Sequence, residues 1–169
     1  AEGVSLLAVQ ETLFTDSAAQ SLGPWLRLNS ERIPSRKSGV SFFIAPRLRG
    51  AIPHYKMISD RLLSLTMLTR SGPVVYINVH TLAEKGYTLE DKQRHWDLLS
   101  HTLDSIPRSH TVVLLGDFNL KWHGRHHDET DVLGPCVFGK GLDYLTTQTQ
   151  VNRTLGLETC RTHRLIHLN

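Results

Sequence analysis

The stretch from Thr111 to Asn119, Thr-Val-Val-Leu-Leu-Gly-Asp-Phe-Asn, says most about the fold of this 169-residue chain. Residues 112–115 are apolar on consecutive positions, a pattern that predicts a strand buried on both faces in the middle of a sheet. Because an extended chain alternates its side chains between two faces, we expect Asp117 and Asn119 on one face at the strand end. Such strand ends often carry catalytic groups, although Gly-Asp-Phe-Asn alone also fits a simple turn.

A helix is expected before this strand. Thr88-Leu89-Glu90-Asp91 resembles a capping box in which Asp replaces the usual Glu or Gln. An apolar stripe with spacings of three and four follows and ends before Pro107; it consists of Trp96, Leu99, Leu103 and Ile106. This pattern predicts a strand–helix–strand crossover in which the helix covers one face of the sheet.

Further apolar runs predict strands at residues 4–9, 40–44, 62–68 and 74–79. The Ser-Gly-Pro sequence at 71–73 is typical of a turn, so residues 62–68 and 74–79 are expected to form a hairpin. Loops are expected around 23–24, 33–38 and 121–141. Residues 146–169 show no convincing period, and their structure is left open.

Composition sets the broad class. The length and the 40% hydrophobic content fit one domain, residues 1–169, and the net charge of +3 favours a polyanionic partner only weakly. The many Lys and Arg residues of the first half indicate either a phosphate-contacting face or solvated loops. Two cysteines without a disulfide or zinc pattern, no membrane-span-length run and no secretory signal favour an intracellular protein. We expect both ends to be cuts within a longer protein.

Glu11 is a second carboxylate at a strand end, because Gln10-Glu11-Thr12 follows the apolar residues 6–9. Taken alone, Glu11 fits a helix cap or a surface acid better than a catalytic role. Its place in a longer order of motifs makes it more specific. That order continues with Ser-Gly-Val-Ser-Phe at 38–42, the run at 74–80, the expected helix and Gly-Asp-Phe-Asn at 116–119.

This ordered set resembles the endonuclease/exonuclease/phosphatase superfamily. The Gly-rich residues 131–141 are similar to a stretch that the apurinic-type endonuclease domains of non-LTR retrotransposons carry after Gly-Asp-Phe-Asn. The resemblance covers residues 6–145 and leaves 146–169 as an uncertain tail. It implies an α/β fold, a four-layer α-β-β-α sandwich incomplete at both ends of this chain, with the active site at one end of the sheets.

The resemblance implies phosphodiester hydrolysis, and the residue types agree with it. Glu11 is the candidate ligand for Mg²⁺, with Mn²⁺ also possible, since such cations prefer hard oxygen donors. Asp117 is the candidate base that orients and deprotonates water. Asn119 is expected to donate to a phosphate oxygen or to hold Asp117. The implied activity is nicking of target DNA in the nucleus, by a domain joined to a reverse transcriptase.

Several departures from the family leave the activity open. His80 takes the place of a tyrosine that lies against the phosphate, and it is either a phosphate donor or a partly buried strand-end histidine. The family's first strand would precede Ala1, and no Ser-Asp-His motif follows. The alternatives are therefore a catalytically dead remnant or nucleic-acid-binding module and, against the Gly-rich stretch, a phosphoinositide or sphingomyelin phosphodiesterase. The histidines at 123–127 lack the partners of a zinc site.

Overall fold

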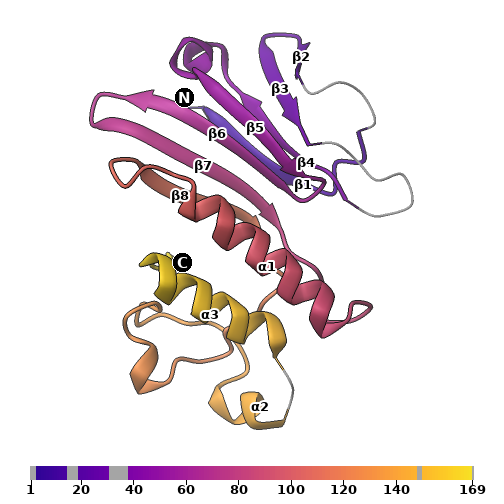
Figure 1. The fold of residues 1–169 in the computed structure, drawn as a ribbon, viewed down its shortest axis with the longest axis vertical. Helices are drawn as coiled ribbons and strands as arrows, with labels where there is room; N and C mark the ends of the chain where they lie inside the picture. Colours follow the sequence, from indigo (N-terminus) through magenta and orange to yellow (C-terminus); the bar gives the residue numbers. More distant parts are fainter. Residues whose placement is uncertain (1–2, 15–18, 31–37, 148–149, 169) are drawn as a thin grey trace. The chain divides into compact units, whose positions relative to one another are not determined.

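The computed structural model describes residues 3–14, 19–30, 38–147 and 150–168. The chain packs as two compact units, one of Ala1–His80 with Ile106–Asp117 and the other of Thr81–Ser105 with Phe118–Asn169. The strands that the structure describes belong to the first unit and its α-helices to the second (Figure 1). Two four-stranded sheets together with helices confirm the expected α/β class.

The first sheet is antiparallel and has the order β1-β4-β3-β2, where β1 is Leu6–Gln10, β4 is Val40–Ile44, β3 is Trp25–Asn29 and β2 is Ala19–Leu22. The run at 40–44 becomes β4, and the run at 4–9 becomes β1 with a slight shift. The expected loop at Gly23-Pro24 is the turn between β2 and β3. Neither β2 nor β3 was predicted. For β2 the reason is that it is exposed throughout and carries no pattern of burial.

The second sheet has the order β5-β6-β7-β8, where β5 is His54–Ser59, β6 is Leu62–Thr69, β7 is Gly72–His80 and β8 is Thr111–Asp117. The predicted hairpin is confirmed, since β6 and β7 pair antiparallel around residues 70–71. The crossover is confirmed as well, since β7 and β8 are parallel. β5, whose residues are half exposed and half partly buried, was not predicted.

The prediction that residues 111–115 form a middle strand is wrong. Among the described strands β8 lies at the edge of its sheet and pairs with β7 alone, and residues 112–115 are only partly buried. The physical reason is that a run of consecutive apolar residues reports that both faces of a strand are covered. It does not report how many strands flank it, because hydrogen-bonded neighbours lie in the plane of the sheet.

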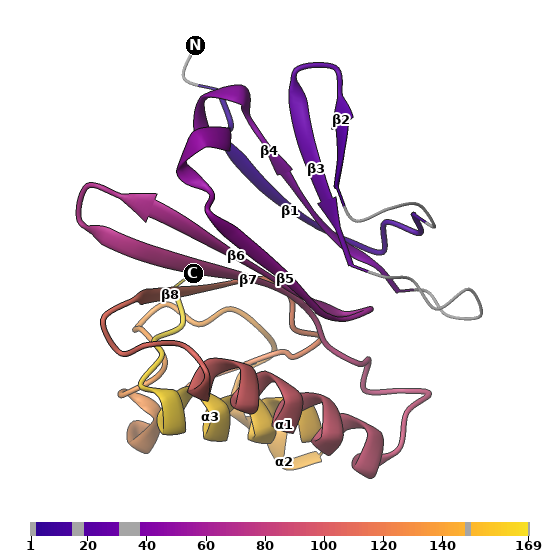
Figure 2. The same ribbon diagram turned by 45° about the horizontal axis from the view of Figure 1, so that its top comes forward.

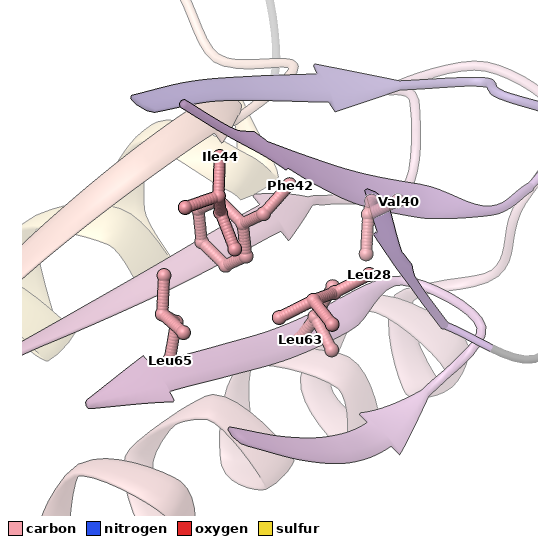
Figure 3. Close-up of a cluster of buried hydrophobic side chains, with 6 residues drawn as sticks. All are labelled: Leu28, Val40, Phe42, Ile44, Leu63 and Leu65. Carbon is pink, nitrogen blue, oxygen red and sulfur yellow. The ribbon is translucent and has the colours of Figure 1, made fainter. Parts of the chain in front are cut away.

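The core of the first unit lies between its two sheets (Figure 3). Val40, Phe42 and Ile44 alternate along β4 and point to the same side, as the period of two requires. They pack with Leu63 and Leu65 of β6. This packing fixes the two sheets face to face, so that residues at the ends of β1 and β7 can meet.

The second unit is built around helix α1, Leu89–Asp104. Its predicted capping box is present: the Thr88 hydroxyl accepts from the backbone N–H of Asp91 at 3.1 Å, and the Asp91 carboxylate accepts from the N–H of Thr88 at 3.2 Å. The predicted stripe is buried within the helix, whereas Ile106 lies beyond its end. The other helical segments are η2 at His127–Glu129, α2 at Leu142–Thr147 and α3 at Val151–His163.

Helix α3 occupies the tail that the sequence left open, and it lies beside α1 (Figures 1 and 2). Gly156 makes the close approach possible, because a Cβ there would lie 2.8 Å from Cδ2 of Leu120 and 3.3 Å from the Trp96 ring. A buried ion pair joins α3 to the preceding loop, with 2.6 Å between Nη2 of Arg153 and a carboxylate oxygen of Glu129. In the described residues, no helix is long and apolar enough to span a membrane.

Candidate active site

Three of the four predicted site residues lie at strand ends in the first unit. His80 ends β7 and Asp117 ends β8, and the parallel register of these strands makes them neighbours. Glu11 directly follows β1, and its Oε1 lies 3.8 Å from Nε2 of His80. The structure therefore brings two carboxylates together around one imidazole.

Asn78 joins the end of β7 to β1 and β4, and the sequence did not single it out. It is fully buried; its side-chain amide donates to the carbonyls of Val9 at 3.1 Å and Ser41 at 2.9 Å, and its Oδ1 accepts from Nε2 of Gln10 at 2.7 Å. One side chain of the second sheet is thus bonded to β1 and β4 of the first. The available signal was a single polar residue inside an apolar strand, two positions before His80.

Gly116 permits the close approach of β8 to β7 at the site. A Cβ at this position would lie 2.8 Å from the carbonyl carbon and 2.9 Å from the nitrogen of Val79, with the Val79 oxygen closer still. Its φ of +139° also lies in a region that L side chains rarely adopt. The Gly-Asp sequence therefore has a steric reason, because the glycine lets Asp117 lie beside His80.

Arg61 fixes the orientation of His80 and was considered in the sequence only as one basic residue among many. Its Nη1 lies 3.2 Å from Nδ1 of the His80 ring, and the backbone N–H of His80 donates to the Arg61 carbonyl at 3.0 Å. A guanidinium can only donate, so Nδ1 accepts and the ring proton resides on Nε2. Burial and then the charge of Arg61 lower the pKa of His80 below 6.5, against the opposing effects of Asp117 and Glu11. His80 is thus a neutral imidazole at neutral pH whose Nε2–H is directed toward the Glu11 side.

Asn119 belongs to the second unit. Strand β8 ends at Asp117, and Asn119 has a left-handed φ of 45°, so the strict alternation on which the sequence argument rested does not extend to it. Asparagine tolerates this conformation better than most residues. Its side-chain amide donates to the Thr81 carbonyl at 2.8 Å, which fixes the direction of the side chain.

Two basic residues of the first half, Arg27 and Arg61, are buried. They therefore belong neither to a phosphate-contacting face nor to solvated loops, the two alternatives that the sequence left open. Arg27 is buried, with its guanidinium 3.9 Å from the centre of the Phe14 ring and a hydrogen bond of 2.6 Å to Gln20. Arg61 is buried beside His80. Both cations therefore act inside the first unit. The expected loop at 33–38 and its basic residues lie outside the described residues, except for Ser38.

The carboxylate oxygens of Glu11 and Asp117 fit a cation that keeps much of its hydration shell. In the described part of the chain, no group of three or more His, Cys, Asp or Glu side chains is placed to hold a metal ion. The Glu11 side chain is 57% exposed, and Asp117 is exposed. Mg²⁺ is commonly bound through one or two carboxylates plus water and substrate phosphate, so this donor set suits it better than a metal that needs a closed protein cage.

The loop at 121–141 has a positive character near His123. This histidine is buried, its Nδ1 accepts from the backbone N–H of Lys140 at 3.2 Å, and its ring centre lies 4.6 Å from that of Tyr144. Burial and then the charges of Lys121, Lys140 and Arg153 lower the pKa of His123. Lys121 and Lys140 are exposed, and Nζ of Lys140 lies 4.4 Å from the centre of the Tyr144 ring.

Comparison with known proteins finds a family for the chain. Residues 2–161 match the model of the Endonuclease/Exonuclease/phosphatase family. The match extends well beyond residue 145, where the resemblance in the sequence motifs ended, and includes most of α3. A search of curated proteins found no match.

Proposed function

Because the chain belongs to the endonuclease/exonuclease/phosphatase family, we propose that it hydrolyses phosphodiester bonds of DNA with the help of a divalent cation. Enzymes of this family hydrolyse phosphodiester or phosphate ester bonds and generally depend on a divalent metal ion. The choice of DNA as substrate, of Mg²⁺ as the ion and of individual residues for each role belongs to the proposal.

The observation that carries the proposal is the meeting of Glu11, His80 and Asp117 at the ends of β1, β7 and β8. At one end of the two packed sheets lie the exposed carboxylates of Glu11 and Asp117. Beside them lies the neutral imidazole of His80, which donates through its Nε2–H. The buried bonds of Asn78 and Arg61 hold these groups in place, as a preorganised site requires. A purely structural cluster has no need of two exposed carboxylates beside a buried histidine.

Each group has a role in hydrolysis. Glu11 would hold the cation, which neutralises charge on the phosphoryl oxygens when bound. Asp117 accepts a proton from the attacking water as the water oxygen bonds to phosphorus; the bond from phosphorus to the leaving oxygen breaks, and the leaving oxygen takes up a proton from solvent water. The Nε2–H of His80 donates to a phosphate oxygen, and a neutral imidazole performs this role without a charge change. Asn119 is proposed as a further donor to the phosphate.

The narrower assignment rests on the sequence and on charge. The Gly-rich residues 131–141 are similar to those of non-LTR retrotransposon endonuclease domains, and this similarity supports a domain that nicks target DNA in the nucleus and is joined to a reverse transcriptase. The exposed Lys121 and Lys140 support a polyanionic substrate, since cations of this kind contact phosphates without reading sequence.

The proposal is tested by incubating the protein with supercoiled plasmid and Mg²⁺ and following the formation of nicked circles. Nicking is expected with Mg²⁺ or Mn²⁺ and is expected to stop in EDTA. Glu11→Gln should raise the Mg²⁺ concentration needed for half-maximal rate, because it removes a carboxylate ligand. Glu90→Gln is the matched control, since Glu90 is an exposed residue of α1 that pairs with Arg94 on the same helix.

Three outcomes would overturn the proposal in different ways. Binding of DNA without any nicking would favour the non-catalytic nucleic-acid-binding alternative. Turnover of phosphoinositide or sphingomyelin head groups without nicking would retain the hydrolase and replace the substrate. Nicking that persists in EDTA would remove the cation from the scheme.

A further inference from the structure

Asn152, at the start of α3, is a fully buried polar side chain of the second unit. It has no exposed surface, and its Nδ2 donates to the carbonyls of Leu82 at 2.7 Å and Asn119 at 3.1 Å. Its Oδ1 accepts from Nε1 of Trp96 at 3.1 Å. Both hydrogens of the amide are used and the oxygen has a partner, so the surroundings require an asparagine side chain. Aspartate would lack the two donors, and leucine would leave the three polar partners unpaired.

The partners of Asn152 are the segments that directly follow the site-bearing strands. Thr81 and Leu82 follow His80 in the chain, and Asn119 comes two residues after Asp117. Asn119 is itself bonded to the Thr81 carbonyl through its side chain at 2.8 Å. Within the second unit, Asn152 and Asn119 therefore tie these two segments to each other and to the first turn of α3.

Two more bonds strengthen this attachment. The backbone N–H of Asn152 donates to Oε1 of Glu84 at 2.7 Å, and the other carboxylate oxygen of Glu84 lies 2.6 Å from Nζ of the buried Lys92 on α1. The start of α3 is thus fixed by α1 as well as by the segment after β7. Asn119 has a left-handed φ of 45°, which asparagine tolerates better than most residues, and bonds at its carbonyl and at its side chain hold it in this conformation.

We propose that Asn152 is a positioning residue that holds Asn119 in its left-handed conformation and directs its side chain for phosphate binding. The proposal rests on the proposed function, because it gives a helix without reacting groups a role in placing Asn119, a proposed phosphate donor. It assigns a purpose to the tail of the chain, whose sequence showed no pattern of its own.

The test compares Asn152→Ala with Trp96→Phe. The first variant removes both donations from Asn152, including the one to Asn119, whereas the second removes only the bond from the indole N–H and leaves those donations intact. We expect kcat for plasmid nicking to fall about 10- to 100-fold in Asn152→Ala with KM within about twofold, since displacements near 1 Å can have such effects on catalysis. Trp96→Phe should lose stability and keep kcat within about twofold, as expected of a side chain that acts on folding alone.

A double variant separates positioning from general loosening. If Asn152 acts through Asn119, then Asn152→Ala should lower kcat no further in an Asn119→Ala background, because groups that act as a unit are not additive. Equal fold-losses in the two backgrounds would overturn the proposal. Equal kcat losses in Asn152→Ala and Trp96→Phe would overturn it too, since stability alone would then explain the effect.

A readout independent of activity keeps this inference separate from the proposed function. In NMR spectra of the unliganded protein, the side-chain amide signal of Asn119 should shift or broaden in Asn152→Ala and stay in place in Trp96→Phe. An unchanged Asn119 signal in Asn152→Ala would overturn the positioning role even if the enzyme is active. A shifted signal in a protein that cleaves no phosphodiester would support the contact and reject the proposed function.

Discussion

Replacement of Gly116 by alanine should destabilise the first unit and separate the strand ends that carry the site. The added Cβ would lie 2.8 Å and 2.9 Å from backbone atoms of Val79, a range that real Cβ atoms essentially never show, with the carbonyl oxygen closer still. The atoms it meets are backbone, which cannot turn aside as a flexible side chain can. Strand β8 must therefore move away from β7 where Asp117 neighbours His80.

The magnitude follows from two contributions. A non-glycine residue at this φ of +139° costs about 1–3 kcal/mol, and overpacking adds about 1–3 kcal/mol. The sum of about 2–6 kcal/mol is a large part of the stability of an ordinary domain, about 5–15 kcal/mol. At about 2–4 °C per kcal/mol for a chain near this size, a loss of about 4 kcal/mol lowers Tm by about 8–16 °C.

Urea and thermal unfolding of Gly116→Ala, compared with Gly50→Ala, measure this effect. Gly50 is the matched control because a Cβ there has no atom within 4 Å. It should unfold within about 1 kcal/mol of the wild type, as surface substitutions usually do. If Gly116→Ala is equally close to the wild type, then β7 and β8 do not approach each other as described, and the steric reason for the Gly-Asp sequence fails.

Three further predictions concern charge. Arg153→Leu leaves the Glu129 carboxylate buried without its partner and should lower the free energy of unfolding in urea by about 3–5 kcal/mol; a loss below about 1 kcal/mol would contradict the buried pair. The pKa of His80 in the folded protein lies below 6.5, so at pH values below 6.5 the unfolded chain binds more protons than the folded protein. The free energy of unfolding therefore falls as the pH drops below 6.5. His80→Gln should flatten this pH dependence, and an equally steep curve would refute the assignment. If the proposed function holds, Lys140→Ala should weaken binding of a DNA duplex and lower the slope of log K against log[salt] by about 1, whereas an unchanged slope would contradict the proposed contact of Lys140 with DNA.

The sequence predicted those parts of the fold whose signals are local. The run at 40–44 and the helix that begins after Thr88 carry their own hydrophobic period or cap, and the structure has them nearly where the pattern put them. β2 is short and exposed, so no period marks it. The edge position of β8 depends on which strands pair, which its own residues do not encode.

The residues of the candidate site also divide into those with a local sequence signal and those without one. Glu11, His80 and Asp117 could be named because each follows or ends an apolar run and because the order of these motifs resembles that of a known family. Arg61, Asn78 and Asn152 could not be placed, because their partners are distant in sequence. Asn78 lies 68 positions from Gln10, and Asn152 lies 70 positions from Leu82. A polar residue within an apolar strand was the only local sign of any of them.

The rate at which Asp117→Asn nicks supercoiled plasmid in saturating Mg²⁺ tests the central claim most directly. Asparagine keeps the size of the side chain and cannot accept the proton from water, so single-turnover nicking should slow by about 10²–10⁴-fold while thermal unfolding stays close to that of the wild type. Asp97→Asn, the same change at an exposed position of α1, should keep the wild-type rate. Nicking by Asp117→Asn at the wild-type rate would contradict the assignment of the active site to the ends of β1, β7 and β8.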